Sequence, residues 1–330
     1  MNKNFILFLL GLPKIGNVSA RKIASCLDSH GVAFDDRTLL SAPEACLKEA
    51  ARCNPKYVFS HAEIEAAKAN LTEIMEACVA YRVSSVGFTD AAFPKQLNDI
   101  QNPPACLFYQ GALSIVSRQT GIAVVGTRTP TKHGYKIGEG IGEMLADAGV
   151  TVVSGLATGC DTAGHKGCLK HGGKTAAVMA EGLHTIYPES NKGLAEEILE
   201  KGGCLLSEYA PGKNAYKTNF VQRDRLQSGL SSGVIVIETG IVGGTMHTVQ
   251  FALKQGRLVG AYRHDEKFAR CEQAKGNASL ISSGQALPLR TRKDLEAFIA
   301  GCRSKNGAAE TGTAPSACAQ MTLFETEATL

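Results

Sequence analysis

The stretch from residue 121 to residue 165 constrains the fold of this chain more than any other part of the sequence. A short apolar run at residues 122–125 stops at Gly126. A segment of helical periodicity follows, with Ile137, Ile141 and Leu145 on one face. A second apolar run at residues 151–154 then leads into a glycine-rich loop. Two buried strands that are joined by one helix are expected to be parallel neighbours in a sheet.

The alternation of apolar runs and helical segments continues to about residue 262. It predicts further strands at residues 175–180, 204–207, 234–238 and 258–262. Helices are expected between them, at about residues 191–200, around residues 220–226, and at about residues 245–255. Alternation of this kind is typical of an α/β protein with a mostly parallel, doubly wound sheet.

Residues 1–80 form a separate helical domain in this interpretation, and residues 12–23 have the form of a helix-hairpin-helix. Lys14, Arg21 and Lys22 lie beside the start of its second helix, where they are suited to a phosphate, although a hairpin that only packs explains them equally well. The apolar run at residues 5–12 resembles a secretory signal, but a buried first helix explains it better. Residues 81–120 are a connector with one edge strand at residues 106–109.

Composition limits the partners and the compartment. The chain has 35 Lys and Arg against 31 Asp and Glu, so a nucleic acid would need a local basic patch. Its 11 cysteines contain no C-x-x-C pair, which favours reduced thiols in the cytoplasm over a disulfide framework or a zinc site. No segment approaches about 18 apolar residues, so we expect no membrane span.

The loops after the parallel strands should meet at one edge of the sheet, where doubly wound proteins bind ligands. The loop after the first strand contains Gly126, Thr127 and Arg128. Glycine turns before helix starts favour a phosphate, and Arg128 can hold one with two N–H bonds. Since no G-x-G-x-x-G follows the first strand, an NAD site is disfavoured.

Other cations and aromatic residues fall on or near the same edge. Taken singly, each cation is explained as a solvated side chain and each aromatic residue as a packing residue. Taken together, the cations indicate that the ligand is a polyanion, and the aromatic residues offer surfaces on which bases could stack. They are Lys132, Lys166, Lys192, Lys213, Lys217, Arg223, Arg225, Tyr187, Tyr209, Tyr216 and Phe220.

Candidate catalytic groups lie near the loops without the spacing of a known triad or metal site. These groups are Asp161, His165, Glu181, His184, Glu208, Glu238 and His247. Of these, Asp161 is explained as the cap of its helix and His165 as a packing residue. We therefore expect no enzyme activity, no cofactor and no metal.

Seven stretches follow one another in the order of a known family. They read LPKIGNVSARKI, FPKQLNDIQNPPACLFYQG, VVGTRTPTKHG, VSGLATGCDTAGHKGCLKHGGKTAAVMAEGLHTIYPESNKGL, LLSEYAPG, NFVQRDRLQSGLSSGVIVIE and QGRLVGAY. On these stretches the chain resembles the DNA-processing protein A family, also called Smf, over about residues 1–300.

The resemblance implies an extended Rossmann-like domain at residues 121–300 that binds single-stranded DNA without sequence preference. It also implies a homodimer that helps load the RecA recombinase in natural transformation and recombination. The phosphate-binding set implied by position, together with the nearby candidates above, is Gly126, Thr127, Arg128, Lys132, Ser154, Gly155, Leu156, Ala157, Lys192, Asn219, Arg223, Arg225, Gly243, Gly244 and Thr245.

Two departures from the family pattern leave alternatives open. Asp224 stands where the family usually has Asn between two arginines, and its charge either weakens phosphate contact or holds the arginines in place. The loop after Glu238 lacks the usual serine-rich sequence. Its Gly243-Gly244-Thr245 is similar to part of the lonely-guy nucleoside-monophosphate phosphoribohydrolase motif, without the catalytic Glu of that motif. Phosphoribohydrolase activity and a non-catalytic nucleotide-sensing domain are therefore the alternatives.

Residues 301–330 form a tail that is rich in small and polar residues, and we expect disorder from about Ser304 onward. One apolar island at residues 320–324 resembles the Q-L-x-L-F peptide that docks into the replication sliding clamp. Gln320 would hydrogen bond beside a pocket that Leu323 and Phe324 fill. A chance match is the alternative.

Overall fold

The structure is a computed structural model that describes residues 1–54, 56–118, 120–269 and 271–310. Within these residues, nine strands form one sheet in the order β1-β2-β6-β5-β4-β3-β7-β8-β9. The strands are β1 (Ser84–Gly87), β2 (Cys106–Gly111), β3 (Gly121–Val125), β4 (Thr151–Ser154), β5 (Thr175–Met179), β6 (Cys204–Ser207), β7 (Gly233–Val236), β8 (Leu258–Tyr262) and β9 (Leu287–Leu289).

The central part of the sheet is parallel, as the apolar runs predict. Every pairing from β6 through β5, β4, β3, β7 and β8 to β9 is parallel, whereas β1 and β2 add an antiparallel edge beside β6. The α/β doubly wound fold class is therefore confirmed. The strands β1 and β9 were not expected from the sequence, because each is short and has exposed or half-exposed positions.

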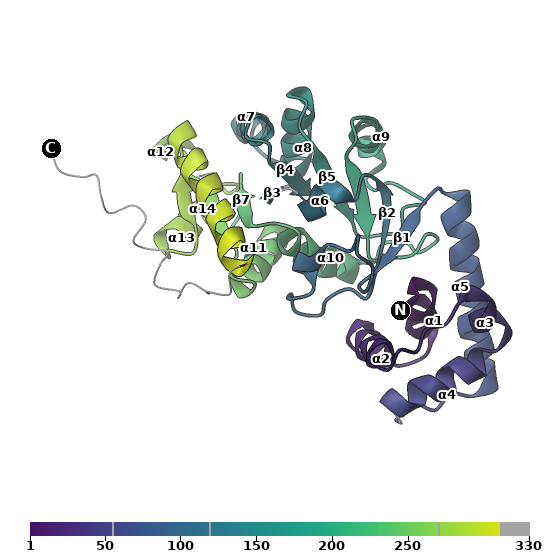
Figure 1. The fold of residues 1–330 in the computed structure, drawn as a ribbon. Helices are drawn as coiled ribbons and strands as arrows, with labels where there is room; N and C mark the ends of the chain where they lie inside the picture. Colours follow the sequence, from purple (N-terminus) through teal and green to yellow (C-terminus); the bar gives the residue numbers. More distant parts are fainter. Residues whose placement is uncertain (55, 119, 270, 311–330) are drawn as a thin grey trace.

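Alternate residues of β3 point to opposite faces of the sheet, and both faces are covered. Ile122 and Val124 join a core cluster with α7 (Lys132–Asp147), while Ala123 and Val125 join a cluster with α11 (Gly244–Lys254). In Figure 1 the helices α7, α8 (Cys160–Lys170) and α9 (Lys192–Glu200) lie together on one side, and α10 (Lys217–Gly229) lies with α11 on the other. Burial on both faces explains why the central strands are almost continuously apolar.

The N-terminal part consists of helices that pack against the antiparallel edge (Figure 1). They are α1 (Lys3–Gly11), α2 (Asn17–Ser29), α3 (Asp36–Ser41), α4 (Pro43–Cys53) and α5 (His61–Ala80). Phe5 and Phe8 are fully buried, so the apolar run at residues 5–12 belongs to a core helix, as expected. Arg21 of the predicted hairpin donates to the carbonyl of Pro104 and lies over the ring of Phe88, so it holds the connector and does not face outward toward a phosphate.

The expectation that all thiols are reduced is wrong for one pair of cysteines. Cys26 of α2 and Cys53 of α4 form a disulfide, with 5.9 Å between their Cα atoms. Because the two residues are 27 positions apart, only the packing of α2 against α4 brings them together, and no local spacing indicates the pair.

The helix α6 (Ser114–Arg118) lies at the end of the connector, between β2 and β3. The C-terminal part contains α12 (Glu266–Ala269), α13 (Lys275–Ser282) and α14 (Arg292–Glu310). The disorder expected from Ser304 is wrong as far as Glu310, because α14 continues to that residue. Its apolar residues, such as Phe298, anchor the helix against the sheet. The peptide containing Gln320, Leu323 and Phe324 lies outside the described residues. Among the described residues, no helix has the length and apolar character needed to cross a membrane.

Candidate nucleic-acid interface

The candidate site lies where the strand order reverses direction. In the sheet, β3 lies between β4 and β7. The helix that follows β3, α7, packs on one face of the sheet, whereas the helix that follows β7, α11, packs on the opposite face. A crevice is expected at the carboxyl ends of strands at such a point. A cavity of about 400 Å³ is found there.

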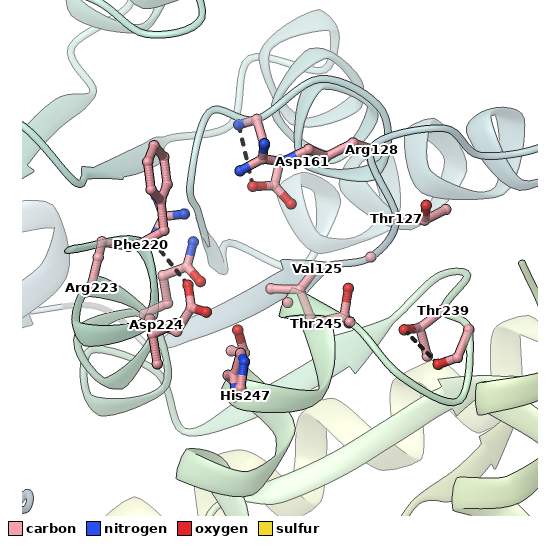
Figure 2. A pocket seen from close by; sticks show the side chains of 18 of the residues that line it. Val125, Thr127, Arg128, Asp161, Phe220, Arg223, Asp224, Thr239, Thr245 and His247 are labelled. Carbon is pink, nitrogen blue, oxygen red and sulfur yellow. Dashed lines mark hydrogen bonds and ion pairs between the residues drawn. The ribbon is translucent and has the colours of Figure 1, made fainter. Parts of the chain in front are cut away.

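Segments far apart in the sequence line this cavity (Figure 2). They are the end of β3 with its loop, the loop into α8, one face of α10, and the loop from β7 into α11. The lining residues are Val125, Gly126, Thr127, Arg128, Ala157, Asp161, Phe220, Val221, Arg223, Asp224, Gln227, Thr239, Gly240, Val242, Gly243, Gly244, Thr245, His247 and Thr248.

Arg128 is the exposed cation of the cavity, on a loop that is itself held firmly. The N–H of Thr127 donates to the Glu238 carbonyl at 2.7 Å, and the Thr127 carbonyl accepts from Cys160 at 3.1 Å. The Arg128 guanidinium lies 5.4 Å from the centre of the Phe220 ring and makes no hydrogen bond or ion pair within the described part of the chain. A rigid loop therefore presents a free guanidinium at the mouth of the cavity.

The start of α11 forms the opposite wall. Gly243, Gly244 and Thr245 line the cavity there, and no side chain caps this helix. Because the first N–H groups of a helix have no intrahelical partner, an uncapped helix start beside Arg128 favours an anion. Gly243 adopts a φ of 150°, which an L side chain rarely adopts, so glycine is required at this turn.

The loop after β4 is braced by protein contacts, and only Ala157 of its predicted residues lines the cavity. The N–H groups of Gly155 and Ala157 donate to Asp161 Oδ2 at 3.1 and 3.3 Å. The Ser154 hydroxyl donates to Val124, and the Leu156 carbonyl accepts from Asn191. These amides are engaged with a carboxylate, so they are not free donors for a phosphate.

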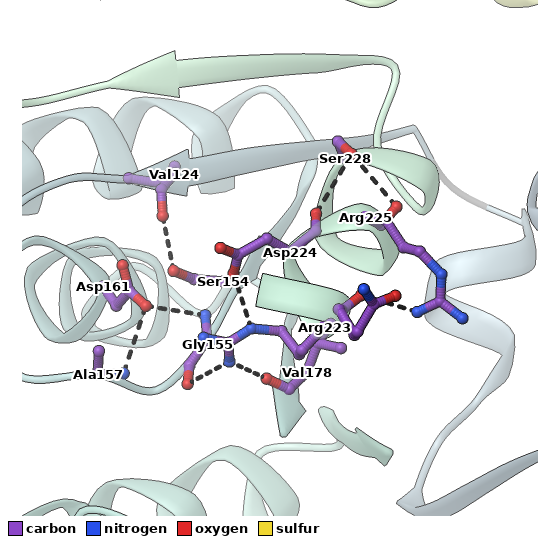
Figure 3. Close-up of polar contacts among 11 residues, drawn as sticks. Val124, Ser154, Gly155, Ala157, Asp161, Val178, Arg223, Asp224, Arg225 and Ser228 are labelled. Carbon is purple, nitrogen blue, oxygen red and sulfur yellow. Dashed lines mark hydrogen bonds and ion pairs between the residues drawn. The ribbon is translucent and has the colours of Figure 1, made fainter. Parts of the chain in front are cut away.

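The two arginines of α10 also have protein partners. Arg223 is 6% exposed, and its guanidinium donates to the carbonyls of Gly155 and Val178 and to Asp224 (Figure 3). It lines the cavity, but its donors hold the loop and strand in place. Asp224 thus holds Arg223, one of the two roles that its charge suggested.

Arg225 lies outside the cavity. It is 2% exposed and makes two bonds of 2.6 and 2.8 Å to the Glu208 carboxylate. Its remaining donors reach the carbonyls of Asn102 and Gln222. With all of these donors engaged, the expected phosphate contact by Arg225 has no support in its geometry.

Three other predicted residues lie away from the cavity. Asn219 is buried and donates to the Ala180 carbonyl at 3.2 Å. Lys132 and Lys192 are exposed at the first positions of α7 and α9, on the same edge of the sheet, and they do not line the cavity. They can contribute to the field at this edge without being part of the cavity wall.

Two buried carboxylates face the cavity, and burial changes their acidity. Burial raises the pKa of Asp161 to about 6, against the lowering effects of Arg223 and of the two loop N–H groups. The pKa of Asp224 is also raised, because burial outweighs the attraction of Arg223, His247 and Arg128. Both groups therefore lose their charge more readily than a surface aspartate does.

The carboxylates suspected of hydrolysis do not reach the cavity. Glu181 accepts from the N–H of Tyr187, and burial raises its pKa. Glu238 is fully buried and accepts from the N–H and the hydroxyl of Thr131. His165 is buried with Nδ1 at 2.6 Å from the Thr175 hydroxyl, and burial lowers its pKa to about 3. All three groups are part of the packed framework.

Sequence reasoning missed several residues of the cavity, among them Gln227, Thr239 and Val242. Gln227 was detectable, because residues 220, 224 and 227 follow the i, i+4, i+7 spacing of one helical face. Thr239 and Val242 carry no comparable pattern, since they belong to an irregular loop.

Comparison with known proteins gives matches to one family over most of the sheet domain. The model of the family described as DNA recombination-mediator protein A matches residues 84–300. The chain is 39% identical to the DNA processing protein DprA of Streptococcus pneumoniae over 175 residues, which are 53% of this chain and 61% of that protein. It is 37% identical to protein Smf of Synechocystis over 198 residues, 59% of this chain and 49% of that protein. It thus spans about half to two thirds of these relatives.

Solved structures show the same fold. The X-ray structure of DNA processing protein A from Streptococcus pneumoniae has a TM-score of 0.73 at 28% identity, and the match covers 89% of this chain and 97% of that one. A structure of DNA processing protein A from Helicobacter pylori, which concerns the binding mode of that protein for single-stranded DNA, has a TM-score of 0.59 at 26% identity. That match covers 68% of this chain and 96% of the other.

Proposed function

Because this chain belongs to the family of DNA recombination-mediator protein A, we propose that it binds single-stranded DNA in the cytoplasm and helps load the RecA recombinase onto that DNA. The observation that supports the DNA-binding step is Arg128. It is the exposed cation of the cavity, and within the described residues its guanidinium makes no hydrogen bond or ion pair. Held on a rigid loop, it can donate two N–H bonds to a phosphate without first breaking a hydrogen bond or an ion pair.

The surroundings of Arg128 suit a DNA backbone. The uncapped start of α11 adds N–H groups on the other side of the cavity, and Lys132 and Lys192 add positive charge at the same edge. Tyr187 and Phe220 contact each other edge to face at 5.8 Å between ring centres and offer apolar surface for bases. The phosphate contacts themselves carry no sequence information, and we expect them to make the affinity depend strongly on salt.

The test replaces Arg128 by Ala and measures affinity for single-stranded DNA over a range of salt concentrations. We expect a loss of about tenfold at low salt, since a charge-assisted bond contributes about 1.5–3 kcal/mol. The slope of log K against log salt should fall in magnitude by about 0.7 for one lost phosphate contact. Arg52→Ala, which removes an exposed arginine of α4, is the matched control. Unchanged affinity and slope in a folded Arg128→Ala protein would refute this site.

The loading step and the assembly state need separate measurements. RecA filament formation on single-stranded DNA can be followed through the DNA-dependent ATP hydrolysis of RecA. We expect the chain to shorten the lag of that reaction and Arg128→Ala to restore it. We also propose that the chain forms a homodimer, and sedimentation of the free chain tests this. Release of free base from a nucleoside monophosphate would instead support the phosphoribohydrolase alternative.

We also propose that the sliding clamp binds the segment containing Gln320, Leu323 and Phe324. Only its similarity to the Q-L-x-L-F peptide supports this proposal. A peptide of residues 318–328 should bind the clamp and should lose binding when Leu323 and Phe324 are both replaced by Ala. Equal binding by the two peptides would contradict the proposal.

A further inference from the structure

Two buried polar side chains on α10 face the cavity with hydrogen-bonding capacity that the protein does not use. Asp224 is 7% exposed, and its Oδ1 accepts from Arg223 Nε at 3.1 Å. Its Oδ2 makes no hydrogen bond to any described residue. Gln227 is 2% exposed, and its side-chain amide likewise makes none among the described residues. Both side chains line the cavity, so these unused hydrogen-bonding atoms are available to a ligand that enters it.

Asp224 and Gln227 lie at the buried end of one face of α10, along which the exposure of the side chains decreases. Phe220, Asp224 and Gln227 occupy one face of α10, and exposure falls along that order from half-buried Phe220 to 2% for Gln227. Arg128 lies above the outer end, over the ring of Phe220. Figure 2 shows the Asp224 carboxylate directed into the cavity below these two residues. A nucleotide whose phosphate lies at Arg128 would therefore direct its base along Phe220 toward Asp224 and Gln227.

We infer that the cavity accepts one base of the bound DNA strand and selects a base that carries an exocyclic amino group over thymine. This inference rests on the proposed single-stranded DNA binding. A carboxylate oxygen accepts from the N4 amino group of cytosine or the N6 amino group of adenine, whereas it repels the O4 carbonyl that thymine presents at the equivalent position. Gln227 can both donate and accept, so it can pair with the ring atom beside the amino group. Asp224 is thus the specificity-determining residue of the cavity.

The residue type at position 224 decides this selection. An ionised carboxylate only accepts hydrogen bonds, whereas an asparagine amide can turn to donate to the thymine carbonyl. Asp224→Asn keeps the size of the side chain and an acceptor for Arg223. It should therefore remove the selection and leave the cavity in place.

The experiment compares oligo(dT) with the same oligonucleotide carrying interspersed dC, at about pH 8, well above the range in which carboxyl groups ordinarily titrate. We expect the wild-type chain to bind the dC-containing strand about tenfold more tightly. Asp224→Asn should reduce this ratio to about one. Asp147→Asn removes the same charge at the far end of α7, where the side chain is 47% exposed, and should leave the ratio unchanged. Gln227→Met is a second variant, and we expect it to lower the ratio.

The failures of the two proposals are distinguishable. Equal affinity of the wild-type chain for both strands, or a ratio that persists in Asp224→Asn, would overturn the base selection and leave DNA binding intact. No binding of either strand would overturn both. Competition by dCMP but not dTMP, without any preference between the strands, would likewise overturn the base selection within a strand and would indicate a free nucleotide as the ligand that the cavity selects.

Discussion

At the scale of single residues, three arginines that look equivalent in the sequence have different roles. Arg128 is exposed at the mouth of the cavity, whereas Arg223 and Arg225 are 6% and 2% exposed. Arg223 donates to one main-chain carbonyl in a loop and one in a strand, and Arg225 forms a two-bond pair with Glu208. Removing a partner from a buried arginine leaves an uncompensated charge, so these two residues hold the fold while Arg128 can serve a ligand.

Asp161 is the residue whose charge state links the site to pH. Burial raises its pKa to about 6, compared with 3.8 for an unperturbed group. Because the folded-state value lies above the unfolded one, the ionised form is the less favourable form in the folded protein. This destabilisation is present above pH 6 and is relieved as the pH falls from about 6 toward about 4.

We therefore predict that the free energy of unfolding of the wild-type chain rises relative to that of Asp161→Asn between pH 7 and pH 5, by about 1 kcal/mol. Asparagine keeps an oxygen that can accept from Gly155 and Ala157, so the comparison isolates the charge. Urea unfolding at several pH values measures the difference. If the free energies of unfolding of the two proteins changed equally with pH, Asp161 would ionise near its ordinary pKa.

At the scale of elements, the start of α7 is joined to the end of β7. Thr131 caps α7 by accepting from the N–H of Gly134 at 2.9 Å, and it donates its own N–H and hydroxyl to Glu238 at 2.7 Å each. Gly134 allows this contact, because a Cβ there would overlap the Glu238 carboxyl group. The loop that carries Arg128 is therefore held at both ends.

Two glycines of α7 provide a matched test of this junction. Gly134→Ala should cost about 1–3 kcal/mol of stability, because the Glu238 carboxyl group must shift and the cap weakens. Gly140→Ala should instead stabilise the chain by about 0.5–1 kcal/mol, since a Cβ there meets nothing within 4 Å. Thermal or urea unfolding compares the variants. A Gly134→Ala protein as stable as Gly140→Ala would contradict the close approach.

At the scale of the whole molecule, Glu208 connects three parts of the chain. It accepts from Asn17 of the helical part at 2.8 Å and from Arg225 of α10. Arg225 also donates to the carbonyl of Asn102 in the connector, and Asn17 accepts from the N–H of Ala105. The helical part is thus tied to the sheet by a buried polar network, which orients the two parts relative to each other.

This arrangement predicts that Arg225→Lys separates stability from DNA binding. Lysine keeps the charge but cannot form the two-bond pair, so we expect a loss of about 1–3 kcal/mol in the free energy of unfolding. Affinity for single-stranded DNA and its salt slope should stay as in the wild type, in contrast to Arg128→Ala. Weaker binding of single-stranded DNA by Arg225→Lys at unchanged stability would show instead that the Arg225 guanidinium contacts a phosphate.

Much of the fold could be predicted because apolar runs in a doubly wound sheet are buried on both faces. The predicted strands at 122–125, 151–154, 204–207 and 258–262 agree with β3, β4, β6 and β8 within one residue. In contrast, β9 contains a proline and β1 begins with two serines, so neither has the apolar character that marks the central strands.

The parallel sheet, the edge at which its loops meet and the glycine turn that carries Arg128 could all be predicted from the amino-acid sequence. These follow from the period of apolar residues and the local chemistry of glycine. Which arginine is free depends on the three-dimensional packing, because the partners of Arg223 and Arg225 come from segments remote in the chain. The same packing makes Asp224 and Gln227 face one cavity. Partner choice depends on which buried groups packing brings together, and no local pattern encodes it.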